Sequence, residues 1–246
     1  MTPVGLRRPS MILIDVDGTL VDSVPDLAWC VDRMMERLGL PVRGEATVRE
    51  WVGNGAERLV RRALTGRMEG EPDEALFERA YPMFLDLYAA NTCVRSTLYP
   101  GVREGLDSLE TAGIPLGCVT NKVARFTEPL LEHLGLRDDF ALVLSGDSLP
   151  RKKPDPEPLL HAARFFGVAP ADCWLIGDSV NDVRAARAAA FQAVCVTYGY
   201  NHGRDIRATR PDAVLDSLAE LGGLLERAGT ARRTSLGDGV LARSGL

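Results

Sequence analysis

The feature that most constrains the fold is a series of short apolar segments, separated by stretches whose apolar residues have helical spacing. From residue 113 onward the segments IPLGCVT, FALVLSG, CWLIGDS and QAVCVTY alternate with helical patterns. An earlier apolar run, MILI at residues 11–14, adds a strand near the start of the chain. Strands that alternate with helices favour a parallel sheet covered by helices. The sequence therefore predicts a protein of the α/β class.

A long segment without strand patterns interrupts this alternation. Helical spacing begins near Pro25 and runs to Gly39, returns after the turn GNGAER, and covers residues 72–91. We expect no strand between the opening strand and residue 113. The sequence thus predicts an α/β core formed by residues 1–21 and 98–228 and an all-helical insertion at 22–97. Residues 229–246 contain few large apolar side chains, and we expect them to form a flexible tail.

Composition limits the classes of partner. The chain has 246 residues, 46% of them hydrophobic, and its net charge of -5 comes from interspersed acids and bases. The sequence has no basic stripe of the kind that binds nucleic acid or a membrane. The five cysteines are scattered without a CxxC pair, which fits a reducing cytoplasm and argues against a disulfide framework or a zinc site. We expect a monomer or a small homo-oligomer.

Acidic residues follow two of the predicted strands. Asp15 and Asp17 come directly after the first strand, and Asp178 follows the strand CWLIG. Ligands in open α/β sheets bind at the carboxyl ends of the strands, and residues two apart in an extended segment point the same way. Clustered carboxylates repel one another unless a cation neutralises them, and a site with only oxygen ligands favours Mg²⁺. The sequence therefore predicts a magnesium site.

Four segments together carry a family resemblance. DVDGTLVDS, VTNK, KKPDPEPLL and GDSVNDVRAA, in this order, resemble the motifs of haloacid dehalogenase superfamily phosphatases. EWVGNGAERLVRRAL and TYGYNHG also resemble segments of the bacterial phosphoglycolate phosphatases. The resemblance implies a Rossmann-like core with helices on both faces of the sheet, a helical cap inserted after the first strand, and Mg²⁺. It also implies hydrolysis through an aspartyl phosphate. Ile14 stands where these enzymes often have Phe, a position that we expect to serve packing.

The resemblance assigns roles to the residues of the first motif. Asp15 is expected to be the nucleophile and a metal ligand, and Asp17 the general acid and base. The backbone carbonyl of Asp17 is expected to reach the metal, with Asp178 as a further ligand. Gly18 lacks a Cβ, so backbone amides can approach the phosphate there.

The second and third motifs are expected to bind the phosphoryl group. The resemblance gives Thr120 and Asn121 this role, although a Thr-Asn pair after a strand is by itself more typical of a helix cap. Lys153 is expected to stabilise the phosphoryl charge, with Lys152 as its rival. Asp182 is expected in the outer shell, where it orients Lys153 or a metal-bound water.

The insertion is expected to select the substrate. The glycines of GNGAER permit close backbone approach, and free amides at the start of a helix suit the carboxylate of 2-phosphoglycolate. Asn54 and Arg58 are candidate contacts, although a flexible turn and an exposed arginine are the commoner explanations. Lys122 is a further candidate anion contact, against a surface lysine in a first helical turn.

These inferences predict a Mg²⁺-dependent phosphomonoester hydrolase that acts on a small phosphorylated metabolite, 2-phosphoglycolate. The alternatives are a related phosphatase for a sugar phosphate or nucleotide, a phosphosugar mutase, and a phosphate-binding regulatory protein without catalysis. A carbon-halogen hydrolase of similar fold would need neither Asp17 nor Asp178, and both are present.

Overall fold

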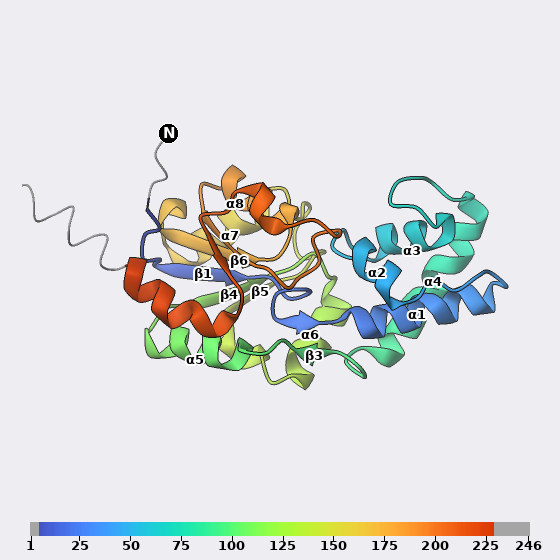
Figure 1. Ribbon diagram of the computed structural model, residues 1–246, viewed down its shortest axis with the longest axis horizontal. Coiled ribbons are helices and arrows are strands. Elements are labelled where there is room, and N and C mark those ends of the chain that lie inside the picture. The colour runs from blue at the N-terminus through green and yellow to red at the C-terminus, as the bar shows by residue number, and fades with distance from the viewer. Residues whose placement is uncertain (1–4, 229–246) are drawn as a thin grey trace, which may run out of the picture.

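The computed structural model describes residues 5–228, and the core of this part is a six-stranded parallel sheet. The strand order is β5-β4-β1-β6-β7-β8, so β1 lies inside the sheet between β4 and β6 (Figure 1). The chain moves outward from β1 in one direction and later returns to its other side, which places a binding crevice at the carboxyl end of β1. The strands are β1 (Met11–Ile14), β4 (Leu116–Val119), β5 (Leu142–Leu144), β6 (Cys173–Gly177), β7 (Gln192–Val196) and β8 (Ala213–Leu215).

Helices cover both faces of the sheet, which confirms the predicted fold class. Alternate residues of the strands point to opposite faces, so Ile12 packs on one side and Leu13 on the other. One face packs against α5 (Val102–Thr111), α6 (Ala124–His133) and a helical segment at 221–228. The opposite face packs against α7 (Glu157–Phe166) and α8 (Val180–Ala188). Four short 3-10 helices complete the core: η1 (Arg137–Asp139), η2 (Pro170–Asp172), η3 (Ile206–Thr209) and η4 (Leu218–Glu220).

Four helices form a separate layer beyond the carboxyl ends of the strands (Figure 1). They are α1 (Val24–Arg37), α2 (Glu45–Trp51), α3 (Ala56–Thr65) and α4 (Glu74–Asn91). Their apolar faces pack on one another around Met34, Val60 and Phe84, all fully buried. We call residues 22–97 the cap. Phe126 and Tyr200 of the core belong to the same hydrophobic cluster. The cap therefore packs on itself and, through these two rings, on the core.

Two very short strands join the cap to the core. β2 (Val21–Asp22) and β3 (Thr97–Leu98) pair antiparallel where the chain leaves and re-enters the core. The expectation of no strand between the first one and residue 113 was therefore wrong, because two-residue strands leave no alternation to detect. Helices α2 and α5 and strand β8 were also not predicted. The tail expected at 229–246 lies outside the described residues. Within residues 5–228, no helix is long and apolar enough to cross a membrane.

Candidate active site

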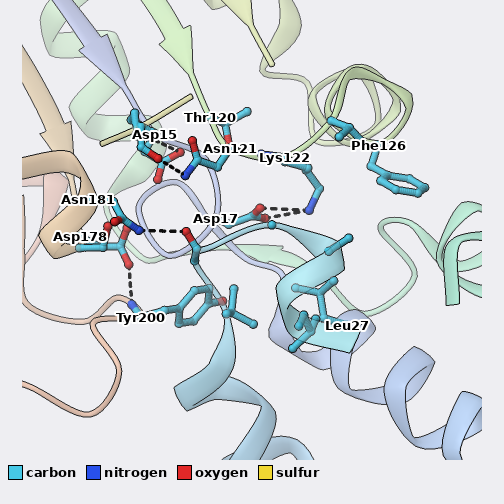
Figure 2. Close-up of a pocket in the computed structure, with 18 of the residues that line it drawn as sticks. Asp15, Asp17, Leu27, Thr120, Asn121, Lys122, Phe126, Asp178, Asn181 and Tyr200 are labelled. Atoms are coloured by element: carbon cyan, nitrogen blue, oxygen red, sulfur yellow. Dashed lines mark hydrogen bonds and ion pairs between the residues drawn. The ribbon is translucent and has the colours of Figure 1, made fainter. Parts of the chain in front are cut away.

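The carboxyl ends of β1, β4 and β6 open into one cavity that the cap covers (Figure 2). The cavity is lined by both polar and apolar side chains, from the core and from the cap. The predicted site residues that line it are Asp15, Asp17, Thr120, Asn121, Lys153, Asp178 and Asp182. The structure therefore brings together residues from all four sequence motifs.

Asp15 lies at the end of the fully buried strand β1. Its backbone amide donates to the carbonyl of Ile176 at 3.0 Å, which extends the pairing of β1 with β6 to this residue. Its carboxylate accepts a hydrogen bond from the amide of Val16 at 2.8 Å and lies 3.0 Å from Nζ of Lys153. Burial raises the pKa of Asp15 to about 6, with Lys153 opposing the shift. The carboxylate is thus held in place but is costly to ionise.

Three carboxylates converge at this point. One oxygen each of Asp15, Asp178 and Asp182 lies within 4.8 Å of the others, and all three residues are buried. Burial and the neighbouring carboxylates raise the pKa of Asp178 well above its usual value. Buried like charges at this spacing are unfavourable without a cation, so this donor set fits a hard divalent ion that prefers oxygen ligands.

Local backbone geometry makes room for the acidic cluster. Asp178 accepts hydrogen bonds from Thr19 Oγ1 at 3.1 Å and from the amide of Tyr200. Gly18 has φ of 86°, and a Cβ at this position would lie 2.3 Å from Oδ2 of Asp178. Its amide donates to the carbonyl of Val21 at 2.9 Å. The structure thus explains Gly18 by the turn and by the space that Asp178 occupies, while its contact with phosphate stays a prediction.

Lys153 is the cation of the acidic cluster. Its Nζ lies 3.0 Å from Oδ1 of Asp15 and 2.7 Å from Oδ1 of Asp182, and it donates to the carbonyl of Val119 at 2.7 Å. Burial opposes the charged form, but the two carboxylates raise its pKa above the usual value, so it remains an ammonium. Asp182 also accepts from the amide and hydroxyl of Ser179 in a capping box at the start of α8. Lys152, the rival of Lys153, lines a different cavity.

Asp17 lies in a different environment from the three clustered acids. Nζ of Lys122 lies 3.0 and 3.1 Å from its two carboxylate oxygens (Figure 2). Ser23 Oγ also donates a hydrogen bond to Asp17 at 2.6 Å. Lys122 is only 8% exposed and does not lie in the first turn of α6. Burial lowers the pKa of Lys122, but Asp17 outweighs this effect and raises it. The side chain of Asp17 is thus held apart from the acidic cluster by a buried lysine.

Thr120 and Asn121 follow β4 at the rim of the cavity. The amide of Thr120 donates to the carbonyl of Leu144 at 2.9 Å, and its hydroxyl accepts from the amide of Lys122 at 3.2 Å. Asn121 Nδ2 donates to the carbonyl of Lys153 at 2.9 Å and so ties two motif loops together. Helix α6 begins after Val123, so the pair does not cap this helix. Their contacts with a phosphoryl group remain predictions.

The cap approaches the acidic cluster through the turn GNGAER. The carbonyl of Gly53 accepts a hydrogen bond from Asn181 Nδ2 at 3.2 Å, a direct contact between cap and core. Gly53 and Gly55 line the cavity, but Asn54 and Arg58 line a separate one. Arg58 forms ion pairs with two cap glutamates, Glu71 at 2.9 Å and Glu69. The structure therefore does not bring Asn54 and Arg58 to the acidic cluster, and their contact with substrate stays a prediction.

Several residues that line the cavity were not predicted as site residues. Asn181 and Ser179 belong to the fourth motif, whose pattern drew attention only to its aspartates. Tyr200 lies in TYGYNHG, a segment noted only for its resemblance. Tyr88 has helical spacing with its neighbours and was interpreted as part of the apolar face of a helix. A polar hydroxyl within that apolar face was the available signal.

Comparison with known proteins agrees with this geometry. The model of the haloacid dehalogenase-like hydrolases matches residues 9–190. The chain belongs to this hydrolase family. A phosphoglycolate phosphatase of Nitrosococcus oceani is 64% identical over 91% of this chain and 99% of its own length. One of Thiobacillus denitrificans is 50% identical over 85% of this chain and 92% of its own length.

Solved structures of the family agree with the fold. The crystal structure of a predicted phosphoglycolate phosphatase from Haemophilus somnus has a TM-score of 0.82 and 37% identity, covering 88% of this chain and 98% of that chain. The family resemblance of the sequence motifs is thus confirmed, and this hydrolase is a phosphatase that closely matches the phosphoglycolate phosphatases.

Proposed function

We propose that this phosphatase hydrolyses 2-phosphoglycolate to glycolate and inorganic phosphate. The observation that carries the proposal is the single cavity in which Asp15, Asp17, Lys153 and Asp178 meet beneath the cap. The relatives named phosphoglycolate phosphatase, similar over nearly their full length, support the substrate.

The first proposed step transfers the phosphoryl group to Asp15. A carboxylate oxygen of Asp15 attacks phosphorus, and the bond between phosphorus and the glycolate oxygen breaks. Lys153, already 3.0 Å from Asp15, neutralises part of the charge on the phosphoryl oxygens. Asp17, as the general acid, gives a proton to the leaving glycolate oxygen. The products of this step are glycolate and an aspartyl phosphate.

The second proposed step removes the phosphoryl group from Asp15. A water molecule attacks phosphorus while Asp17, as the general base, takes one of its protons, which replaces the proton given in the first step. The bond between Asp15 and phosphorus breaks, and phosphate leaves. The cap excludes other water during the first step, so it must admit one molecule for the second.

We infer that Mg²⁺ is the resident ion, held by Asp15, Asp178 and the backbone carbonyl of Asp17. The convergence of three buried carboxylates supports this assignment. A bound Mg²⁺ would offset the repulsion between Asp15 and a phosphate dianion and so permit the attack. Asp182 would orient Lys153, from which it lies 2.7 Å away.

The remaining site residues complete the proposal. Thr120, Asn121 and the backbone at Gly18 would bind the phosphoryl oxygens, and Asn54 and Arg58 would contact the substrate from the cap. All five described cysteines are buried and free, which supports work in the reducing cytoplasm.

A comparison of kcat/KM across small phosphorylated metabolites with Mg²⁺ tests the proposed function. The panel contains 2-phosphoglycolate, sugar phosphates and nucleoside monophosphates, and the assay measures released phosphate, with Asp15→Asn as the blank. We expect a preference for 2-phosphoglycolate of at least about tenfold. A higher kcat/KM for a sugar phosphate would mean that this compound, and not 2-phosphoglycolate, is the preferred substrate. An isomerised sugar phosphate without release of free phosphate would indicate a mutase.

A further inference from the structure

Lys122 is the second cation of the cavity, and it pairs with Asp17 rather than with the acidic cluster of Asp15, Asp178 and Asp182. Among the described residues, only Lys122 and Lys153 bring a cationic side chain to the lining. The ammonium of Lys153 already pairs with two carboxylates, those of Asp15 and Asp182, each within 3.0 Å. A substrate that carries a second anionic group beside its phosphate thus has one remaining ammonium to contact.

The ammonium of Lys122 retains hydrogen-bonding capacity. It has three N–H donors, and its contacts with Asp17 are directed at the two oxygens of one carboxylate. It also lies 4.8 Å from the ring centre of Tyr88, which stacks on Phe84 and makes a tilted ring contact with Phe126. The ammonium therefore sits where the polar floor of the cavity meets its apolar wall.

Tyr88 supplies a second donor at the same point. Its hydroxyl is buried beside the Lys122 ammonium, which interacts with the hydroxyl oxygen, but its O–H has no acceptor. Burial raises the pKa of this hydroxyl, so it remains an O–H donor. A buried O–H group without an acceptor is unfavourable. A ligand oxygen that accepts a hydrogen bond from this O–H is therefore stabilised.

We propose that Lys122 and the hydroxyl of Tyr88 together bind the carboxylate of the substrate. This inference rests on the proposed function, because it assigns the part of 2-phosphoglycolate that lies away from phosphorus. Tyr88 belongs to helix α4 of the cap, whereas Lys122 follows β4 of the core. One carboxylate therefore connects cap and core above the reacting phosphorus.

This arrangement explains how the cavity selects an acid. A substrate with a neutral tail leaves the Tyr88 hydroxyl without a charged acceptor and gains nothing from Lys122. Sites built to pair a polar group discriminate strongly against analogues that lack it, because the buried groups of the site then stay unpaired. The selection arises from two side chains that the sequence places in separate segments.

The test compares two substrates of similar size, 2-phosphoglycolate and 2-hydroxyethyl phosphate, which has a neutral tail. The measured quantity is the ratio of their kcat/KM values. Lys122→Met is expected to lower this ratio at least about 30-fold, because truncating a buried charged partner has an effect of that order. The ratio is used because Lys122 also contacts Asp17, so rates for both substrates will fall.

Three further variants keep the test decisive. Tyr88→Phe retains the ring and is expected to lower the ratio about fivefold or more, even if Lys122→Met fails to fold. Lys122→Arg keeps a cation and should retain more of the ratio than Lys122→Met. Lys152→Met removes a lysine one position from Lys153 that lines only the second cavity, and should leave the ratio unchanged.

The outcomes separate this inference from the proposed function. A wild-type enzyme that does not favour 2-phosphoglycolate overturns both. A wild-type preference that survives within twofold in Tyr88→Phe and Lys122→Met overturns the carboxylate site alone. A ratio that falls in both variants but not in Lys152→Met supports the site.

Discussion

The charged side chains at the carboxyl ends of β1 and β6 lie buried beneath the cap, whereas several on helices α3 and α4 form ion pairs on the cap surface. Asp15, Lys153, Asp178 and Asp182 are each at most 9% exposed. In contrast, the side chain of Glu74, which pairs with Arg61, is 63% exposed. Exposed pairs contribute at most about 1 kcal/mol, whereas burying like charges costs several. The core therefore carries an energetic cost that only its chemistry explains.

The largest expected effect comes from removing the proposed nucleophile. Asp15→Asn should lower kcat at least about 10⁴-fold, because a carboxamide cannot form the phosphoenzyme. Steady-state assay of phosphate release measures it, with circular dichroism as the check on folding. A folded variant that retains a tenth of the activity would remove Asp15 from this role.

Removing a proposed metal ligand should have the next largest effect. Asp178→Asn is expected to weaken Mg²⁺ binding and lower kcat/KM about 10²- to 10³-fold, because the ion loses one of its charged ligands. Thermal unfolding at increasing Mg²⁺ concentration measures the affinity. Glu74→Gln, which also removes one carboxylate, should show the wild-type Mg²⁺ dependence. Equal affinities in the wild type and Asp178→Asn would contradict the metal site.

The buried acids should also make the stability of the metal-free protein depend on pH. The pKa of Asp15 is raised from 3.8 to about 6, so the folded state keeps this proton longer than the unfolded state does. Its contribution is therefore present below pH 4 and is lost as the pH rises through 6, a change of about 2–3 kcal/mol.

Urea unfolding in a chelator tests this dependence. The difference in unfolding free energy between the wild type and Asp15→Asn should shift against the wild type from pH 4 to pH 7. Mg²⁺ competes with the proton, so it should raise the wild-type Tm more at pH 7 than at pH 5. If the difference in unfolding free energy between the two proteins does not vary with pH, burial does not raise the pKa of Asp15.

On the cap, Arg58→Met tests whether the turn GNGAER reaches the substrate. If Arg58 leaves its glutamate partners for the substrate, the variant should change discrimination between 2-phosphoglycolate and p-nitrophenyl phosphate about tenfold. The kcat/KM ratio measures this. Equal losses on both substrates would assign Arg58 to the fold of the cap.

The smallest expected effect comes from the surface of the cap. Glu74→Gln should change the free energy of unfolding by less than about 1 kcal/mol, because its ion pair with Arg61 is screened by solvent. Urea unfolding at two salt concentrations measures it. A loss of several kcal/mol in the free energy of unfolding would contradict the contrast between weak surface ion pairs on the cap and costly buried charges in the core.

The sequence was sufficient to predict five of the six strands of the sheet and the residues that follow β1, β4 and β6. Asp15, Thr120 and Asp178 each follow an apolar strand, and the carboxyl ends of parallel strands meet at one edge. Local sequence therefore determines their position, and the structure places all three in one cavity.

Contacts between segments that are distant in the chain could not be predicted from the sequence. Lys122 and Asp17 are far apart in the chain, and neither spacing nor composition indicates that they pair. Tyr88 has the spacing of a buried helical residue, so the pattern gave no indication that its hydroxyl lines the cavity. Arg58 meets Glu69 and Glu71 across a turn whose path no pattern predicts. Strands of two residues, such as β2, are set by where the chain leaves the core.

Trapping the phosphoenzyme tests the central claim most directly. Wild-type protein is mixed with 2-phosphoglycolate and Mg²⁺, quenched in acid and reduced with borohydride, which converts an aspartyl phosphate to homoserine. Peptide mass spectrometry should then find homoserine at position 15 and at no other aspartate, and none when substrate is omitted. Turnover without modification at position 15, or modification at Asp17 or Asp178 instead, would contradict the account.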